Sequence, residues 1–256
     1  MSRVLRFSAA CALVALAPLL AGCDETPGVP DPFGTPPAIS GIDLTPAEVD
    51  DTSGNATVAL APVLTLDVTG GDGDITVRAF VRGLDGGALV AEAEQTGGAG
   101  GFELRPSFEV PRGAIGRYEI TVTTEDASGR VGDRASAVLV FTSPSLGGPT
   151  ITSTSASPSP VPRPASGSQT VTLSADVDDP DGPANVAYVE LRQGGETLFR
   201  FRDDGTGGDG TPGDGRFALS LAIGSTTPTG TFVFDAVAVD RHGISSVPVE
   251  VTFTVQ

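Results

Sequence analysis

The sequence predicts an all-β chain of two tandem antiparallel β-sandwiches, and three observations support this prediction. Past residue 38 there is almost no helical periodicity, and short runs rich in Val, Thr, Ile and Phe alternate with turns of Gly, Asp and Pro. A hairpin segment beginning at Gly116 recurs 114 residues later, at Gly230. Each repeated unit is about 105 residues long, which suits a sandwich of about seven strands.

The repeat is clearest in the C-terminal part of each unit. Residues 116–122 (GRYEITV) recur as residues 230–236 (GTFVFDA). The turn that follows has matched residues in the two copies, namely Asp126, Gly129, Asp240 and Gly243. An aromatic residue, a strand of period two and an Asp-x-x-Gly turn make a hairpin, in which Gly supplies the positive φ. Because Tyr118 and Phe232 lie at matched strand positions, we assign both to the core.

The other strands follow in the same order in both units. Residues 64–68, 75–82 and 102–104 match residues 173–177, 187–192 and 217–219. Both units resemble the Ig-like or fibronectin type III-like domains of bacterial envelope proteins. The resemblance implies one Ig-like β-sandwich at 38–143 and a second at 149–256, with a boundary where Ser, Pro and Gly cluster. Just after that boundary, Ile151 and Val161 suit a bulged edge strand.

The N-terminus has the features of an export signal. Two arginines precede an apolar stretch at residues 7–20, which is too short for a permanent membrane span. Residues 20–23 (LAGC) resemble a bacterial lipobox. The resemblance implies a lipoprotein signal peptide at 1–22 and acylation of Cys23, where each buried CH₂ contributes about 0.8 kcal/mol to anchoring. An ordinary secretory signal with an incidental Cys is the alternative.

A flexible tether is expected at residues 23–37, because five prolines fall between residues 24 and 38 without apolar periodicity. The predicted location is the cell envelope, with the lipid anchor in the membrane. We expect the outer membrane or cell surface in preference to the inner membrane. Asp24 resembles an inner-membrane retention signal of enteric bacteria, so the leaflet stays open.

The charge balance argues against nucleic-acid binding. All 15 basic residues are Arg, against 32 acidic residues, and the formal net charge is −17. A field of this sign repels phosphate, and phosphate binding needs clustered Lys or Arg. We therefore expect no nucleic-acid partner.

Catalytic motifs are missing from the sequence. His242 is the only His and stands beside Gly243 in an expected turn. A general base needs an orienting partner and a pocket, and one His cannot build a His-based zinc site. We therefore expect no enzyme. The remote alternative is a hydrolase with a carboxylate pair between the domains.

One loop has the composition of a cation site. Residues 203–215 carry four acids separated by glycines, namely Asp203, Asp204, Asp209 and Asp214. Calcium takes six to eight oxygen ligands at about 2.3–2.6 Å. The spacing does not match an EF-hand, and the loop resembles one found in secreted bacterial Ig-like modules. The matching loop of the first unit, residues 96–101, has no acid, so the fold alone does not demand them.

Chain tracing adds three more acids to this candidate site. In an up-and-down tracing of seven strands, the connections that carry Asp179, Asp181 and Asp240 lie at the same end as the acidic loop. That end faces the preceding unit, which resembles the arrangement of cadherin-like repeats, where calcium stiffens the junction. The alternative is that Asp and Gly are simply favoured turn residues.

Together these features predict a non-catalytic, envelope-anchored lipoprotein. Its Ig-like modules would be structural or adhesive, and would bind a protein or glycan partner. The alternative is a calcium-stiffened spacer, with the acidic loop of the second domain as its metal site. No cofactor besides calcium is expected.

Overall fold

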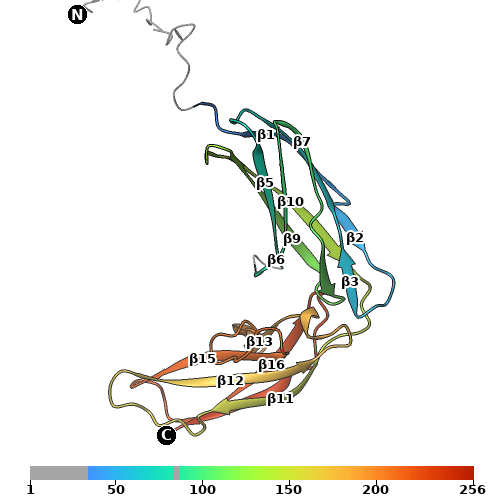
Figure 1. Cartoon of the computed structure of the whole chain (residues 1–256). Coiled ribbons are helices and arrows are strands. Elements are labelled where there is room, and N and C mark those ends of the chain that lie inside the picture. Colours follow the sequence, from blue (N-terminus) through green and yellow to red (C-terminus); the bar gives the residue numbers. More distant parts are fainter. Residues whose placement is uncertain (1–33, 84–86) are drawn as a thin grey trace, which may run out of the picture. The chain divides into compact units, whose positions relative to one another are not determined.

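The computed structural model describes residues 34–83 and 87–256 (Figure 1). The expected signal peptide, Cys23 and most of the tether lie outside the described residues. In the described part, no helix has the length and apolar character needed to cross a membrane. The chain there is built of β-strands, with a short 3₁₀ helix, η2 (Pro183–Asn185).

The first sandwich is built from strands β1 to β10 (Figure 1). One sheet has the order β1 (Ala38–Thr45), β4 (Val63–Thr69), β7 (Gly100–Leu104). The other has the order β2 (Glu48–Asp50), β10 (Val131–Thr142), β9 (Gly116–Asp126), β5 (Ile75–Arg82), β6 (Leu89–Gly97). Strands β3 (Thr57–Leu60) and β8 (Phe108–Pro111) pair separately.

The second sandwich repeats the two larger sheets with strands β11 to β17, and the β3–β8 pair has no counterpart in it. One sheet has the order β11 (Thr150–Ser157), β12 (Ser168–Asp178), β15 (Arg216–Gly224). The other has the order β14 (Glu196–Phe201), β13 (Val186–Gln193), β16 (Gly230–Asp240), β17 (Val249–Val255). The predicted all-β class with tandem Ig-like sandwiches is therefore confirmed.

One detail departs from a purely antiparallel fold. Strand β2 runs parallel to β10, and Val161 forms a parallel bridge with Val255. In each sandwich the first strand, β1 or β11, thus belongs to one sheet. The chain that follows it crosses over and pairs with the last strand, β10 or β17, of the other sheet. This crossing closes the same side of each core and makes the structural repeat more complete than the sequence match.

Each sandwich has its own apolar core, and the alternation of strand residues builds it. In β5, for example, Ile75, Val77, Ala79 and Val81 are fully buried, while the intervening residues are more exposed. Burial of such apolar surface contributes about 25 cal/mol per Å². The two core clusters share no buried residue. The boundaries at 38–143 and 149–256 stay a prediction, although β10 ends at Thr142 and β11 begins at Thr150.

The individual core assignments agree with the structure. Tyr118 is buried in the first core, and Phe232 is partly buried against the second, where its ring stacks on Phe253 at 5.1 Å between centroids. Ile151 and Val161 are also buried. The register of β11 against β12 shifts just after Ile151, which is the expected bulge.

Candidate functional site

The acids predicted to bind metal lie in or directly beside three connections at one end of the second sandwich. These are the β12–β13, β14–β15 and β16–β17 connections, and they share an end because the neighbouring strands run antiparallel. The structure places six of the seven predicted ligands in two groups of three, a loop cluster and a junction group, and leaves Asp204 outside both.

The loop cluster consists of Asp203, Asp209 and Asp214. One carboxylate oxygen from each lies within 4.8 Å of the others. Oxygens around a calcium ion at about 2.3–2.6 Å are separated by similar distances, so the cluster has the span of a cation site. Asp204 is directed elsewhere, because its carboxylate accepts the backbone N–H of Thr206 at 3.0 Å.

Backbone hydrogen bonds hold the loop cluster in place. Asp203 accepts N–H groups from Gly213 at 2.6 Å and Gly215 at 2.9 Å, and Asp209 accepts the N–H of Gly205 at 2.6 Å. A Cβ at Gly208 would lie 2.3 Å from Cγ2 of Thr172 on β12, so the loop packs directly onto the sheet. These contacts fix the loop without a cation, which keeps the interpretation as a set of acidic turns open.

The pKa values within the loop follow from burial and from nearby charge. Burial raises the pKa of Asp203 despite its backbone hydrogen bonds, and the charges of Asp209 and Asp214 add to this shift. The hydroxyl of Thr206 donates to Asp204 and holds the pKa of that carboxyl below its usual range. A cation bound by the loop cluster would favour the ionised forms of its three carboxylates.

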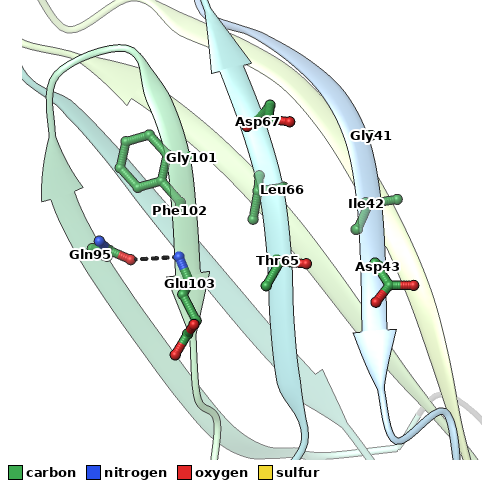
Figure 2. A pocket seen from close by; sticks show the side chains of 10 residues that line it. All are labelled: Gly41, Ile42, Asp43, Thr65, Leu66, Asp67, Gln95, Gly101, Phe102 and Glu103. Carbon is green, nitrogen blue, oxygen red and sulfur yellow. Dashed lines mark hydrogen bonds between the residues drawn. The ribbon is translucent and has the colours of Figure 1, made fainter.

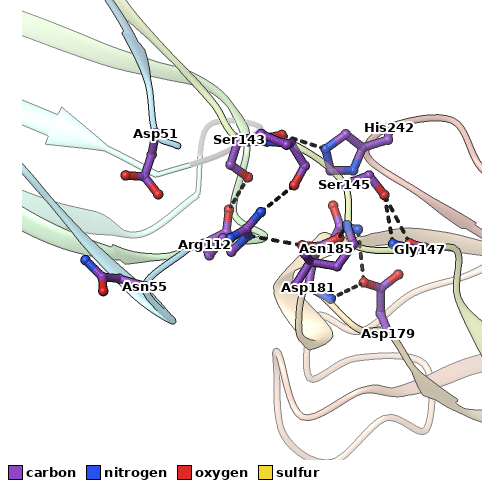
Figure 3. Close-up of polar contacts among 12 residues, drawn as sticks. Asp51, Asn55, Arg112, Ser143, Ser145, Gly147, Asp179, Asp181, Asn185 and His242 are labelled. Atoms are coloured by element: carbon purple, nitrogen blue, oxygen red, sulfur yellow. Dashed lines mark hydrogen bonds and ion pairs between the residues drawn. The ribbon is translucent and has the colours of Figure 1, made fainter. Parts of the chain in front are cut away.

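The junction group begins with Asp181, whose side chain is fully buried and faces the first sandwich (Figure 3). It accepts a hydrogen bond from Nε of Arg112 at 3.2 Å and another from the backbone N–H of Leu146 at 2.8 Å. The guanidinium of Arg112 also donates to the carbonyl of Pro144 at 2.6 Å. Asp181 is therefore half of an ion pair between the sandwiches, with Arg112 as its countercharge.

Three further contacts bring the sandwiches close together at this point. A Cβ at Gly113 would lie 2.5 Å from the carbonyl oxygen of Asp181 and 2.7 Å from Cβ of Asn185. Ala184 of η2 packs against the apolar core of the first sandwich. His242 lies in the β16–β17 turn, as expected, and its Nε2 is 2.9 Å from the carbonyl oxygen of Ser143 (Figure 3).

No sequence pattern predicts a role for Arg112, Gly113 or Asn185. Arg112 follows a short strand and belongs to no motif, so no local signal marks it as a partner of a residue far along the chain. Asn185 stands beside a predicted acidic turn, but an amide in a Gly- and Pro-rich connection is ordinary. Only the packing of the two sandwiches brings these residues together.

The remaining two acids of the junction group share a neighbourhood. Asp179 accepts the backbone N–H of Asp181 at 2.8 Å and an amide hydrogen of Asn185 at 3.1 Å. Burial raises the pKa of Asp179, and the charges of Asp181 and Asp240 add to this shift. Asp240 is 2% exposed and accepts the backbone N–H of Ile244 at 2.6 Å.

A shallow groove of about 560 Å³ crosses the sheet of β1, β4 and β7 in the first sandwich (Figure 2). Its exposed acids are Asp43, Asp67 and Glu103, and the side chain of Gln95 accepts the backbone N–H of Glu103 at 2.9 Å. None of these three acids is buried. The groove is an open surface of hydrogen-bond acceptors.

The chain has low structural similarity to several solved bacterial proteins. No protein-family model matches the chain, and no curated protein sequence matches it. Fibronectin(III)-like modules of Clostridium thermocellum CbhA are 13% identical, with a TM-score of 0.28, over 84% of this chain and 94% of theirs. The sialic acid-binding region of a Streptococcus sanguinis adhesin is 14% identical, with a TM-score of 0.27, over 87% and 78%. A Mobiluncus mulieris adhesin is 9% identical, with a TM-score of 0.28, over 86% and 93%. Likeness at this level assigns no function to the chain.

Proposed function

We propose that the chain is a non-catalytic, envelope-anchored lipoprotein whose two Ig-like sandwiches act as one structural or adhesive unit. The observation that supports this most is the ion pair between Arg112 and Asp181, whose side chains are 8% and 0% exposed. Removing one member of such a pair leaves a buried charge, so the pair resists separation of the sandwiches. A unit held in this way can present a surface at a distance from its membrane anchor.

The anchor is tested by substituting Cys23 in the full chain, expressed in a Gram-negative host. Wild type is expected to incorporate labelled fatty acid and to partition with membranes, whereas Cys23→Ser loses the label. Cys11→Ser is the matched control, because Cys11 lies within the apolar stretch of the signal. Equal labelling of wild type and Cys23→Ser, or no labelling of either, would reject the lipoprotein proposal.

The adhesive role is supported by the exposed edge of the second sandwich. Leu198 and Phe199 are adjacent on edge strand β14, and they are 42% and 50% exposed. Apolar side chains on an unpaired strand edge are a means of binding a protein or glycan. Cells that display the full chain should bind immobilised glycans or matrix proteins, and the double variant Leu198→Ser/Phe199→Ser should not. Val131→Ser is the control, since Val131 is 70% exposed on the first sandwich.

The second candidate function is a calcium-stiffened spacer. The specific observation in its favour is the approach of three carboxylate oxygens from Asp203, Asp209 and Asp214 to within 4.8 Å of one another. Calcium binding by the native state would raise the melting temperature of the chain. Asp209→Asn should reduce that rise. A melting temperature that calcium leaves unchanged would reject this function.

A further inference from the structure

The Asp-x-x-Gly turn of the first sandwich shows how this fold neutralises a buried acid. The side chain of Asp126 is fully buried and accepts backbone N–H groups from Asp72, Ser128 and Arg130 at 2.9–3.0 Å. The guanidinium of Arg130 donates to Asp126 at 2.8 Å and pairs with the carboxylate of Asp72 at 2.5 Å. One arginine thus bridges two carboxylates, one in the β4–β5 connection and one at the end of β9.

The second sandwich keeps the acids but not the arginine. The repeat places Asp240 where the first sandwich has Asp126, and Ile244 where it has Arg130. Asp240 still accepts the backbone N–H of Ile244 at 2.6 Å, as Asp126 accepts that of Arg130. The side chain of Ile244, however, carries no charge. Asp179 comes from the β12–β13 connection, which corresponds to the connection that carries Asp72. The carboxylate pair therefore persists where its bridging cation is lost.

Three buried oxygens around this position have no hydrogen-bond partner among the described residues. They are Oδ2 of Asp179, Oδ1 of Asn185 and Oδ2 of Asp240. Asn185 is fully buried and Asp240 is 2% exposed. Native proteins rarely leave buried polar atoms unpaired, and a buried ionised carboxylate needs a countercharge.

The three residues form one local group. The side-chain amide of Asn185 donates to Oδ1 of Asp179 at 3.1 Å, so these two side chains are neighbours. The charge of Asp240 is close enough to Asp179 to raise the pKa of that carboxyl. The carbonyl of Asn185 accepts the N–H of Arg241, the residue after Asp240, at 2.7 Å. Val186, which follows Asn185, pairs with Asp240 across β13 and β16.

The nearby arginine side chains have other partners. Arg112 binds Asp181 and the carbonyl of Pro144, and Nε of Arg241 donates to the carbonyl of Ala184 at 2.9 Å. Asp181 is likewise occupied by Arg112 and by Leu146. The group of Asp179, Asn185 and Asp240 is thus left with two carboxylates and an amide oxygen, which are hard ligands of the kind that calcium prefers.

We propose that a divalent cation, calcium in the first instance, binds Asp179, Asn185 and Asp240 in the place that Arg130 takes in the first sandwich. Water and backbone carbonyls would complete its coordination. Because Asn185 lies against Gly113 of the first sandwich, the bound cation would order the junction itself. The site deepens the proposed structural role, but it is separate from the loop cluster and does not depend on it.

The test measures calcium binding by the full chain in detergent, by calorimetry after treatment with EDTA. Asp240→Asn retains an oxygen for the N–H of Ile244, and should lose one binding step that Asp209→Asn, in the loop cluster, retains. Asp235→Asn is the matched control, because Asp235 is exposed on the same strand as Asp240. Magnesium chloride in the same titration reports selectivity between the two cations.

A second variant keeps the test decisive if Asp240→Asn folds poorly. Ile244→Arg restores the arginine of the first sandwich, at a residue that is 40% exposed. It should lose the same calcium-binding step and, in EDTA, should melt near the temperature of the calcium-loaded wild type. The proposal is overturned if wild type binds no calcium, or if only Asp209→Asn changes the stoichiometry. Neither result would affect the fatty-acid labelling or adhesion that test the proposed function.

Discussion

The two sandwiches have the same strand plan but treat the same acidic end differently. In the first, Arg130 lies between Asp72 and Asp126, so the charges balance within the sandwich. In the second, one acid, Asp181, is neutralised by Arg112 of its neighbour, and the corresponding internal arginine is replaced by Ile244. The fold therefore specifies where the acids lie but not what neutralises them. In the second sandwich the arginine at the junction neutralises Asp181 but not Asp179 or Asp240.

The loops at this end show the same freedom. In the first sandwich, β6 and β7 are joined by a tight turn at residues 98–99. In the second, the corresponding connection between β14 and β15 spans residues 202–215 and holds three acids within 4.8 Å of one another. A connection that can be so short in one copy does not need its length for folding, so the sandwich tolerates the longer acidic loop.

The largest effect is expected from Arg112→Ala, which leaves Asp181 buried without its partner in the other sandwich. Loss of one member of a buried ion pair costs about 3 kcal/mol, and denaturant unfolding of the full chain would measure it. The double variant Arg112→Ala/Asp181→Asn should recover part of this stability, because it also removes the stranded charge. Additive losses in the double variant would show that the pair does not couple the sandwiches.

A somewhat smaller effect is expected from Gly113→Ala, which fills the closest approach between the sandwiches. The new Cβ would lie 2.5 Å from a backbone oxygen, which cannot move as a side-chain end could. Overpacking of this kind costs about 2 kcal/mol. Hydrogen exchange at residues 143–147 should rise, while Gly98→Ala, with open space around it, should leave exchange unchanged. Unchanged exchange in both variants would mean that the contact does not hold the junction.

Sequence patterns were sufficient to predict the fold class, the repeat and several strands of each sandwich, but not the short strands β2, β3 and β8. Alternating burial has period two, and it follows directly from the order of residues such as Ile75, Val77 and Ala79. The end of the sandwich that carries the acids followed from antiparallel tracing alone. These features depend on local chemistry, which a single sequence contains.

The division of the acids into two groups could not be predicted in the same way. Asp203 and Asp204 are neighbours in sequence, yet one joins the loop cluster and the other turns toward Thr206. Asp181 and Arg112 are separated by 69 positions and meet only because two sandwiches pack together. Side-chain partners of this kind depend on the tertiary arrangement, which the spacing of residues does not encode.

Tyr118→Phe tests whether a difference between the two cores affects stability. The hydroxyl of Tyr118 donates to the carbonyl of Ala114 at 2.7 Å, whereas the matched Phe232 has no such group. Loss of this buried hydrogen bond should reduce stability by about 1 kcal/mol. No difference between wild type and the variant would show that the first core gains nothing from its tyrosine.

The same tyrosine predicts a pH dependence. Burial raises the pKa of Tyr118 from 10.0 to about 12, so the unfolded chain releases this proton first as the pH rises. The stability contributed by the neutral hydroxyl is therefore complete below pH 10 and declines between pH 10 and 12. Unfolding curves should show this decline in wild type and a smaller one in Tyr118→Phe. Parallel curves would contradict the assignment.

The smallest expected effect concerns how stability changes with falling pH, measured in EDTA. A buried acid of the first sandwich and one of the second should act in opposite directions. Burial alone would raise the pKa of Asp126, but the N–H groups and guanidinium around it lower the value to about 2, so the stability it provides is lost as the pH falls from 3.8 toward 2. Burial beside Asp181 and Asp240 raises the pKa of Asp179, so ionised Asp179 destabilises the chain at neutral pH and protonation relieves this.

In calorimetry, Asp126→Asn should therefore melt below wild type at pH 6, and Asp179→Asn above it. Both differences should shrink on acidification, and a loss of stability in both variants at pH 6 would mean that the second sandwich neutralises its acids as the first does.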